Sequence, residues 1–160
     1  MLIQPRRRWL LPVMLGGLIV ALLSTSLWLW HRSTPANDDA PVTVAKLAAQ
    51  DFFTLNYLHP DADLDRVLSR TADPFKAQYS AQRDAVKQGL VDKKLTLTAK
   101  VPENGTALEY RSGDNAQVLV AVDATTATGD GHSETNRYRV RVRLACEANG
   151  WLVTDLTQVG

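Results

Sequence analysis

Cysteine is almost absent from this chain of 160 residues. Its one cysteine, Cys146, excludes a disulfide within the chain. The residue stands in an alternating apolar segment and belongs to no Cys-x-x-Cys or Cys/His pattern. We therefore expect a buried and unreactive thiol.

Histidine is scarce, and its three copies, His31, His59 and His132, are scattered along the chain. None stands with a second histidine or a carboxylate at the spacing of a metal site. The sequence also lacks a Gly-x-Ser-x-Gly motif, a P-loop and a dinucleotide fingerprint. We therefore predict no metal, no cofactor and no enzymatic activity.

An excess of positive charge is missing from the part of the chain that follows Arg32. That part contains 14 Lys and Arg against 17 Asp and Glu, although the whole chain carries a net charge of +1. Nucleic-acid-binding modules normally show the opposite balance. The composition therefore predicts no nucleic-acid partner.

One long apolar run is present, over residues 9–30, and it contains no ionisable side chain. As a helix it would be roughly 33 Å long, enough to cross the core of a bilayer. Tryptophans flank the run and three arginines precede it, so the positive-inside rule predicts a cytoplasmic N-terminus and an exported C-terminal part. The residues predicted to anchor the helix at the membrane interfaces are Arg6, Arg7, Arg8, Trp9, Trp28 and Trp30.

A cleaved signal peptide is the alternative interpretation of the same run. Its apolar stretch is longer than the 7 to 15 residues of a signal core, and no Ala-x-Ala pattern follows it. We therefore predict a single-pass protein of the plasma membrane. Its expected parts are a basic cytoplasmic tail (1–8), a transmembrane helix (9–30), a linker (31–42) and one exported domain (43–160).

The exported segment changes its periodicity halfway along. Apolar residues recur at intervals of three and four in the first half, and they alternate with polar residues in the second. We predict an α+β domain in which three helices pack on a curved antiparallel four-stranded sheet. The expected helices cover 42–58, 61–71 and 73–94, and the expected strands cover 94–101, 116–128, 134–147 and 151–159, with a weaker candidate at 107–111.

Arginine occupies every second position in the strand predicted over 134–147. If the valines of this strand and of its neighbour are both buried, pairing parity places the arginines on the opposite face together with nearby carboxylates. This face is either a solvated sheet surface or a docking face for an acidic partner or anionic lipid headgroups. Its candidate residues are Arg137, Arg139, Arg141, Arg143, Asp123 and Asp155.

The position of Asp155 depends on the turn before the last strand. A three-residue loop with Gly150 in a left-handed bulge would turn Leu152 and Leu156 toward the valines and Asp155 toward the arginines. A two-residue turn would reverse these assignments. We expect the three-residue loop because it buries both leucines.

Aromatic residues at helical spacing could line a cavity between the helices and the sheet. Phe52, Tyr57 and Tyr79 are the candidates for such a lining, although aromatics in this pattern more often belong to the core.

Several blocks resemble a known family when they are taken in order. They are the basic start with its single apolar segment, "AAQDFFTLNY", "LDRVLSRTADPFKAQYSAQRDAV", "AQVLVAVDATTAT", "NRYRVRVRL" and "GWLVTDL". In this order they are similar to the Mce-associated membrane proteins of actinobacteria. The resemblance implies a cone-shaped α+β domain of the NTF2-like and SnoaL-like kind.

The resemblance also implies an accessory, non-enzymatic subunit that stabilises an Mce-type lipid-import complex of the cell envelope, with protein partners and possible contact with lipid. Two other functions remain open. One is an NTF2-like pocket protein or enzyme for a sterol or another lipid. The other is a bitopic scaffold subunit of a secretion-type assembly.

Overall fold

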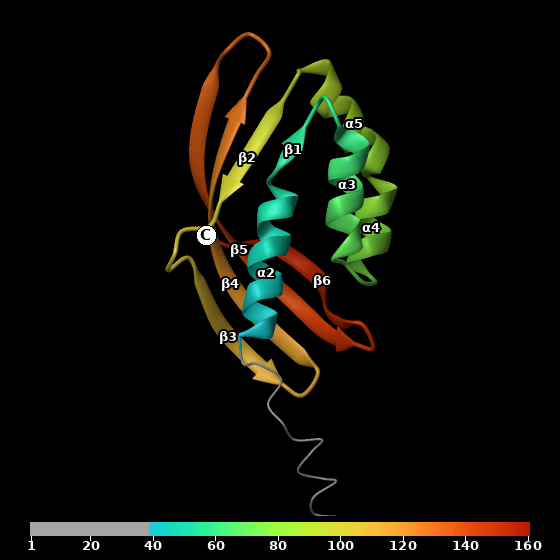
Figure 1. The fold of residues 1–160 in the computed structure, drawn as a ribbon, viewed down its shortest axis with the longest axis vertical. Coiled ribbons are helices and arrows are strands. Elements are labelled where there is room, and N and C mark those ends of the chain that lie inside the picture. The colour runs from blue at the N-terminus through green and yellow to red at the C-terminus, as the bar shows by residue number, and fades with distance from the viewer. Residues whose placement is uncertain (1–38) are drawn as a thin grey trace, which may run out of the picture. The chain divides into compact units, whose positions relative to one another are not determined.

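The structure is a computed structural model that describes residues 39–160 (Figure 1). The predicted tail, the predicted transmembrane helix with its interfacial arginines and tryptophans, and most of the predicted linker lie outside the described residues. Within 39–160, no helix combines the length and the apolar character needed to cross a membrane.

The described part of the chain contains four helices, where the sequence predicts three. They are α2 (Ala40–Phe52), α3 (Pro60–Ser69), α4 (Phe75–Ala81) and α5 (Arg83–Asp92). The single helix predicted over 73–94 is wrong, because the chain breaks at Gln82 into α4 and α5. Gln82 keeps nearly helical backbone angles, so apolar periodicity cannot detect this break.

The first helix is also shorter than predicted. It ends at Phe52, and the next residues form the short strand β1 (Leu55–Asn56), which pairs with β2 (Thr96–Lys100). In addition, the Asn56 amide donates a hydrogen bond of 2.7 Å to the Asp63 carboxylate. Strand β2 and Asp63 therefore supply the hydrogen bonds that the backbone of this segment would make internally in a longer helix.

The sheet is antiparallel and six-stranded, and the α+β class is therefore confirmed. The other strands are β3 (Thr106–Ser112), β4 (Asn115–Ala127), β5 (Ser133–Glu147) and β6 (Gly150–Gln158). The predicted number of four strands is wrong: the weaker candidate over 107–111 does form a strand, β3, and β1 was not predicted. Both β2 and β3 pair with β4, β2 near its end and β3 near its beginning, while β5 covers the other edge of β4 along its whole length.

The core lies between α2 and one face of the sheet, which we call the valine face. Ala45 and Ala49 of α2 are completely buried against it, and Ala48 nearly so. Small side chains allow this helix to lie close to the strands, and Figure 1 shows α2 running across the sheet. The buried residues of the valine face are Ala116, Val118, Val120, Val122, Val140, Val142, Leu144 and Val153.

A second apolar cluster joins the other three helices to β1 and β2. Its buried members are Leu55, Leu64, Val67, Tyr79 and Leu90. In Figure 1, α3, α4 and α5 lie to the right of β1 and of the upper part of α2.

The turn before β6 differs from the prediction. Glu147 pairs with Gly150, so the turn contains two residues, and Val153 instead of Leu152 faces the core. A β-bulge opposite Arg143 and Leu144 then shifts the register by one residue. Beyond the bulge Leu156 packs against the core, as predicted, and Asp155 pairs with Arg143.

Candidate functional site

The face of the sheet opposite the valine face carries the four arginines of β5, and we call it the arginine face. Val118 pairs with Val142 and Val120 with Val140, while Asp123 pairs with Arg137. The predicted register of β4 and β5 is therefore confirmed. Adjacent residues in a strand point to opposite faces, and burying the valines consequently exposes the arginines.

Arg137 forms a two-pronged ion pair with Asp123. Its Nε and Nη2 atoms lie 2.5 Å and 2.8 Å from the two carboxylate oxygens. The hydrogen bond from Arg137 holds the pKa of Asp123 below its ordinary value. Both side chains are accessible to solvent, so this pair contributes little to stability.

Glu109 is a member of this face that the sequence analysis missed. Arg141 donates to both of its carboxylate oxygens, at 2.8 Å and 3.1 Å, and Gln117 donates to one of them at 3.1 Å. The hydrogen bond from Arg141 lowers the pKa of Glu109. A register irregularity between Leu108 and Tyr110 brings Glu109 to this face, and strict alternation in the sequence does not reveal such a shift.

Asp155 and Arg139 are the remaining predicted members of the arginine face, and Lys100 of β2 lies opposite Asp123 on the neighbouring strand. Asp155 lies 3.4 Å from the Nη1 atom of Arg143. It reaches this face through the bulge in β6 and not through the predicted three-residue turn. Arg139 is exposed, and no acidic side chain among residues 39–160 forms an ion pair with it. Three of the four arginines therefore each pair with one carboxylate.

An apolar hollow of about 320 Å³ lies at the opposite side of the fold, where α2 ends. Two of its predicted lining residues, Phe52 and Tyr79, do line it, whereas Tyr57 does not and packs instead at the second apolar cluster. The full lining is Phe52, Phe53, Leu55, Phe75, Gln78, Tyr79, Gln82, Val86 and Leu97.

The lining of this hollow is mainly apolar and aromatic. Its lining contains no carboxylate and no histidine among the described residues, and the Tyr79 phenol is its one titratable group. Burial raises the pKa of Tyr79, so the phenol stays protonated at neutral pH. The hollow can accept an apolar group, but it offers no acid or base poised near neutrality.

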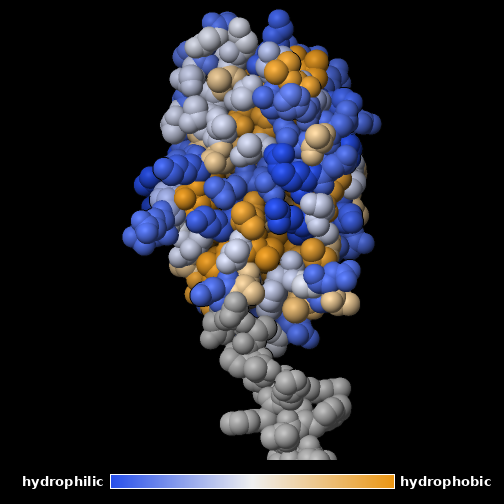
Figure 2. Space-filling view, viewed as in Figure 1, coloured by the Kyte–Doolittle hydropathy of each residue, from blue (hydrophilic) through white to orange (hydrophobic). Residues whose placement is uncertain are grey.

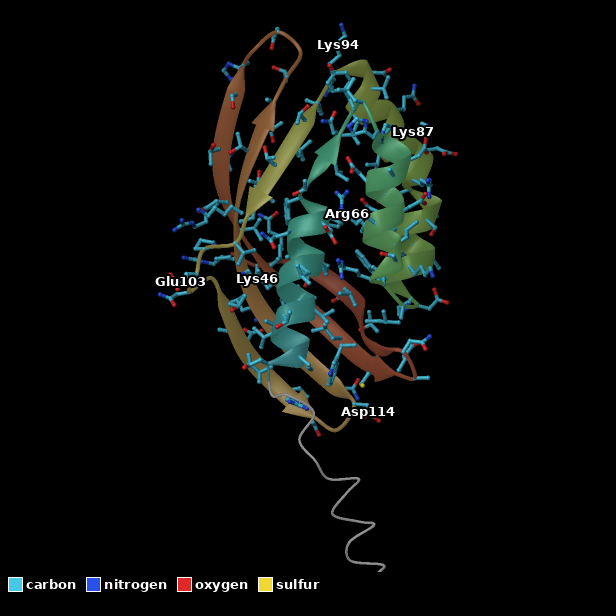
Figure 3. The ribbon with its side chains drawn as sticks, in the orientation of Figure 1. Lys46, Arg66, Lys87, Lys94, Glu103 and Asp114 are labelled. Atoms are coloured by element: carbon cyan, nitrogen blue, oxygen red, sulfur yellow. The ribbon has the colours of Figure 1, made fainter. Side chains whose placement is uncertain are left out.

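A cluster of ion pairs connects α2 to α3 beside this hollow. Asp51 accepts hydrogen bonds from Arg66 at 3.0 Å and from Arg70 at 2.6 Å, and Arg66 also donates to Asp63 at 2.7 Å. Arg66 lies between the two helices in Figure 3 and donates to the Thr54 carbonyl at 2.8 Å. All four side chains have charged partners inside the cluster, which favours a structural role.

The described residues contain no group of three or more histidine, cysteine, aspartate or glutamate side chains placed to hold a metal ion. Cys146 is half-buried at the end of β5, so it is more accessible than the sequence suggests.

Comparison with known sequences finds no match, neither to a protein family nor to a curated protein. Solved structures do match. The periplasmic domain of DotI superimposes with a TM-score of 0.68 at 14% identity, over 79% of this chain and 98% of that one. An IcmL-like type IV secretion system protein from Legionella pneumophila gives a TM-score of 0.64 at 14% identity, over 78% of this chain and 93% of that one.

CagV, a VirB8 homolog of the Helicobacter pylori type IV secretion system, gives a TM-score of 0.57 at 13% identity, over 73% of this chain and 97% of that one. The fold is also similar to that of a Novosphingobium aromaticivorans protein described as an aromatic ring hydroxylase. The TM-score is 0.52 at 15% identity, over 76% of this chain and 94% of that one. Identities this low establish the fold and leave the activity open.

These findings overturn the resemblance to the Mce-associated membrane proteins of actinobacteria. No family matches, and the similar structures include several domains of type IV secretion proteins. The blocks on which the resemblance rests encode a helical stripe, alternating strands and their turns. Any chain with this fold needs those patterns, so they identify the fold and not the family.

Proposed function

We propose that this protein is a non-enzymatic, single-pass membrane subunit that acts as a scaffold in a secretion-type assembly, with its domain outside the cytoplasm. The fold likeness to the DotI, IcmL-like and CagV domains carries this proposal. It covers 93–98% of each of those chains, so the likeness extends to a whole domain and not to one motif.

Two further observations support a scaffold. The sequence predicts one membrane-spanning helix before the domain, over residues 9–30. The apolar hollow has no carboxylate or histidine in its described lining, which argues against proton-transfer catalysis there. Protein partners in the envelope are therefore the expected ligands of this chain.

A second candidate function is binding of a small apolar molecule, such as a sterol or another lipid. The hollow of about 320 Å³, with Phe52 and Tyr79 in its lining, favours it. The likeness to a protein described as a hydroxylase is compatible with such a pocket on this fold.

One purification from native membranes tests both candidates. The full chain, carrying a C-terminal tag and expressed at its natural level, is solubilised in mild detergent and separated by native electrophoresis. We expect a particle larger than the chain that contains membrane subunits of a secretion machinery, identified by mass spectrometry. Recovery of the chain alone, while other membrane complexes in the sample remain intact, would contradict the scaffold proposal.

The same sample is extracted with organic solvent to identify bound lipid. A stoichiometric lipid that disappears from a Val86→Trp variant, which fills the hollow, would favour the second candidate.

A further inference from the structure

Arg139 differs from the other three arginines of β5 because no acidic side chain within residues 39–160 forms an ion pair with it. Arg137, Arg141 and Arg143 pair with Asp123, Glu109 and Asp155 at 2.5 Å, 2.8 Å and 3.4 Å. The direct cross-strand neighbour of Arg139 on β4 is Ala121, which offers no charge. On the other side, the Val159 amide donates to the Arg139 carbonyl, so the guanidinium takes no part in that contact.

Arg139 lines two hollows of the domain. One, of about 130 Å³, is lined by Asn104, Gly105, Thr106, Ala107, Leu119, Ala121 and Arg139. The loop between β2 and β3, in which Figure 3 labels Glu103, leads into the rim of this hollow. The other hollow, of about 220 Å³, is lined by Arg137, Tyr138, Arg139, Gln158, Val159 and Gly160.

The first hollow is mainly apolar, and Gly105 helps to keep it open. A Cβ atom at Gly105 would lie 3.0 Å from Pro102 and 3.1 Å from the Ala121 carbonyl oxygen, which is tighter than ordinary contact. The Gly105 carbonyl accepts a hydrogen bond of 2.7 Å from the Ala121 amide, and this bond fixes the chain segment at Gly105 against β4. Arg139 therefore lines a small, mainly apolar recess whose Gly105 segment is held against β4.

The charge of Arg139 is uncompensated on a domain whose overall charge is negative. Residues 39–160 contain 14 Lys and Arg against 16 Asp and Glu, so the domain as a whole does not attract anions. A membrane surface is normally bound by clusters of about four to eight Lys and Arg, and here three of the four arginines are already paired. One free guanidinium next to an apolar recess suits a single carboxylate and its apolar neighbour better than a lipid surface.

We propose that Arg139 is the docking point for an acidic segment of a partner protein, whose glutamate or aspartate pairs with the guanidinium while an adjacent apolar side chain enters the Gly105 hollow. The planar guanidinium can donate two parallel hydrogen bonds to one carboxylate, which gives direction as well as affinity. The identification of this partner as an assembly subunit rests on the proposed function, whereas the recognition of a carboxylate does not.

The experiment measures peptide binding to the full chain in neutral detergent micelles by fluorescence anisotropy at low salt. The probe is a labelled nine-residue peptide in which glutamate alternates with leucine, and the matched peptide carries glutamine in place of each glutamate. We expect the glutamate peptide to bind at least tenfold more tightly. We expect Arg139→Gln to remove at least tenfold of that affinity and Arg139→Lys to restore part of it.

Arg143→Gln is the matched control, since it removes the same charge from the same face but from an arginine that Asp155 already pairs. It should change the affinity less than threefold. Ala107→Phe, which fills the apolar hollow at an exposed position, should weaken binding although no charge changes. Circular dichroism confirms that each variant is folded.

Equal binding of the two peptides, or equal losses in the Arg139→Gln and Arg143→Gln variants, would overturn the proposal. Phosphatidylglycerol added to the micelles distinguishes a lipid ligand: if it displaces the glutamate peptide from the wild type, the face binds lipid headgroups and the protein-partner proposal fails. Failure of the native purification with retained peptide selectivity would reject the assembly while leaving the docking point in place.

Discussion

At the scale of single residues, Asp63 of α3 is the one charged residue among residues 39–160 that is buried. Its side chain is only 11% exposed, and it accepts hydrogen bonds from the Asn56 amide and from Arg66, both at 2.7 Å. It therefore fixes the chain segment between α2 and α3 as well as the arginine that reaches toward α2. Removing the Asp63 charge therefore weakens two hydrogen bonds to a buried carboxylate, although Arg66 keeps its ion pair with Asp51.

We expect Asp63→Asn to lower the free energy of unfolding by about 2 kcal/mol, because hydrogen bonds to charged groups contribute about 1.5–3 kcal/mol. Urea unfolding of the full chain in mild detergent, followed by circular dichroism, measures the change. Asp65→Asn, two residues away on the same helix, is the control: Asp65 pairs with Arg83, but its side chain is 66% exposed. The control should lose less than about 1 kcal/mol, because exposed ion pairs contribute little. Equal losses in the two variants would show that the Asp63 contacts are not important for stability.

At the scale of elements, the close contact between α2 and the sheet depends on a stripe of alanines. Ala45 and Ala49 are completely buried one turn apart, and Ala48 lies beside them. Larger side chains would push the helix away from the valines beneath it, whereas the opposite side of α2 carries the exposed Leu47. Figure 2 shows hydrophobic and hydrophilic residues mixed over the area where α2 lies.

Ala49→Leu should destabilise the domain by about 1–3 kcal/mol, because it adds volume to a contact that is already closed. Gln50→Leu introduces the same side chain at the neighbouring, half-exposed position and should change stability by less than about 0.5 kcal/mol. The midpoint temperatures of thermal unfolding of the two variants, compared with that of the wild type, measure both effects. If Ala49→Leu melts at the wild-type temperature, space must exist between α2 and the sheet.

At the scale of the whole molecule, the proposal depends on where the domain lies relative to the membrane. The arginines at positions 6–8 precede the predicted membrane helix, and His31 and Arg32 follow it. This asymmetry favours a cytoplasmic N-terminus and an exported domain. An exported domain would also meet its acidic partner outside the cytoplasm.

Fusing alkaline phosphatase to the C-terminus should therefore give active enzyme. Fusing green fluorescent protein to the same end should give cells without fluorescence. Replacing Arg6, Arg7 and Arg8 together with asparagine should reduce phosphatase activity, since it weakens the bias that sets the orientation. A bright fluorescent fusion with inactive phosphatase would place the domain in the cytoplasm and remove the basis for an envelope scaffold.

The local pattern of apolar and polar residues was sufficient to predict the class of the fold and the face on which each residue of the central strands lies. The alternation of Val118, Val120 and Val122 with polar residues has one solution that buries both valine sets, so it also predicts the pairing of Asp123 with Arg137. The helix over α3 follows in the same way from its apolar stripe. The resemblance built on these patterns was wrong because they specify the fold and little else.

Contacts between distant residues decided the rest. The chain leaves the helical state after Phe52 because β2, some forty residues later, offers a strand partner to Leu55. The bulge near Leu108 brings Glu109 to Arg141, 32 residues away, and the bulge in β6 places Asp155 beside Arg143. The sequence by itself therefore determined which face carries the arginines, because alternation is a local property of a strand. Only the tertiary structure decided that Arg139 is the one without an acidic partner in the described domain, since register and bulges assign the carboxylates.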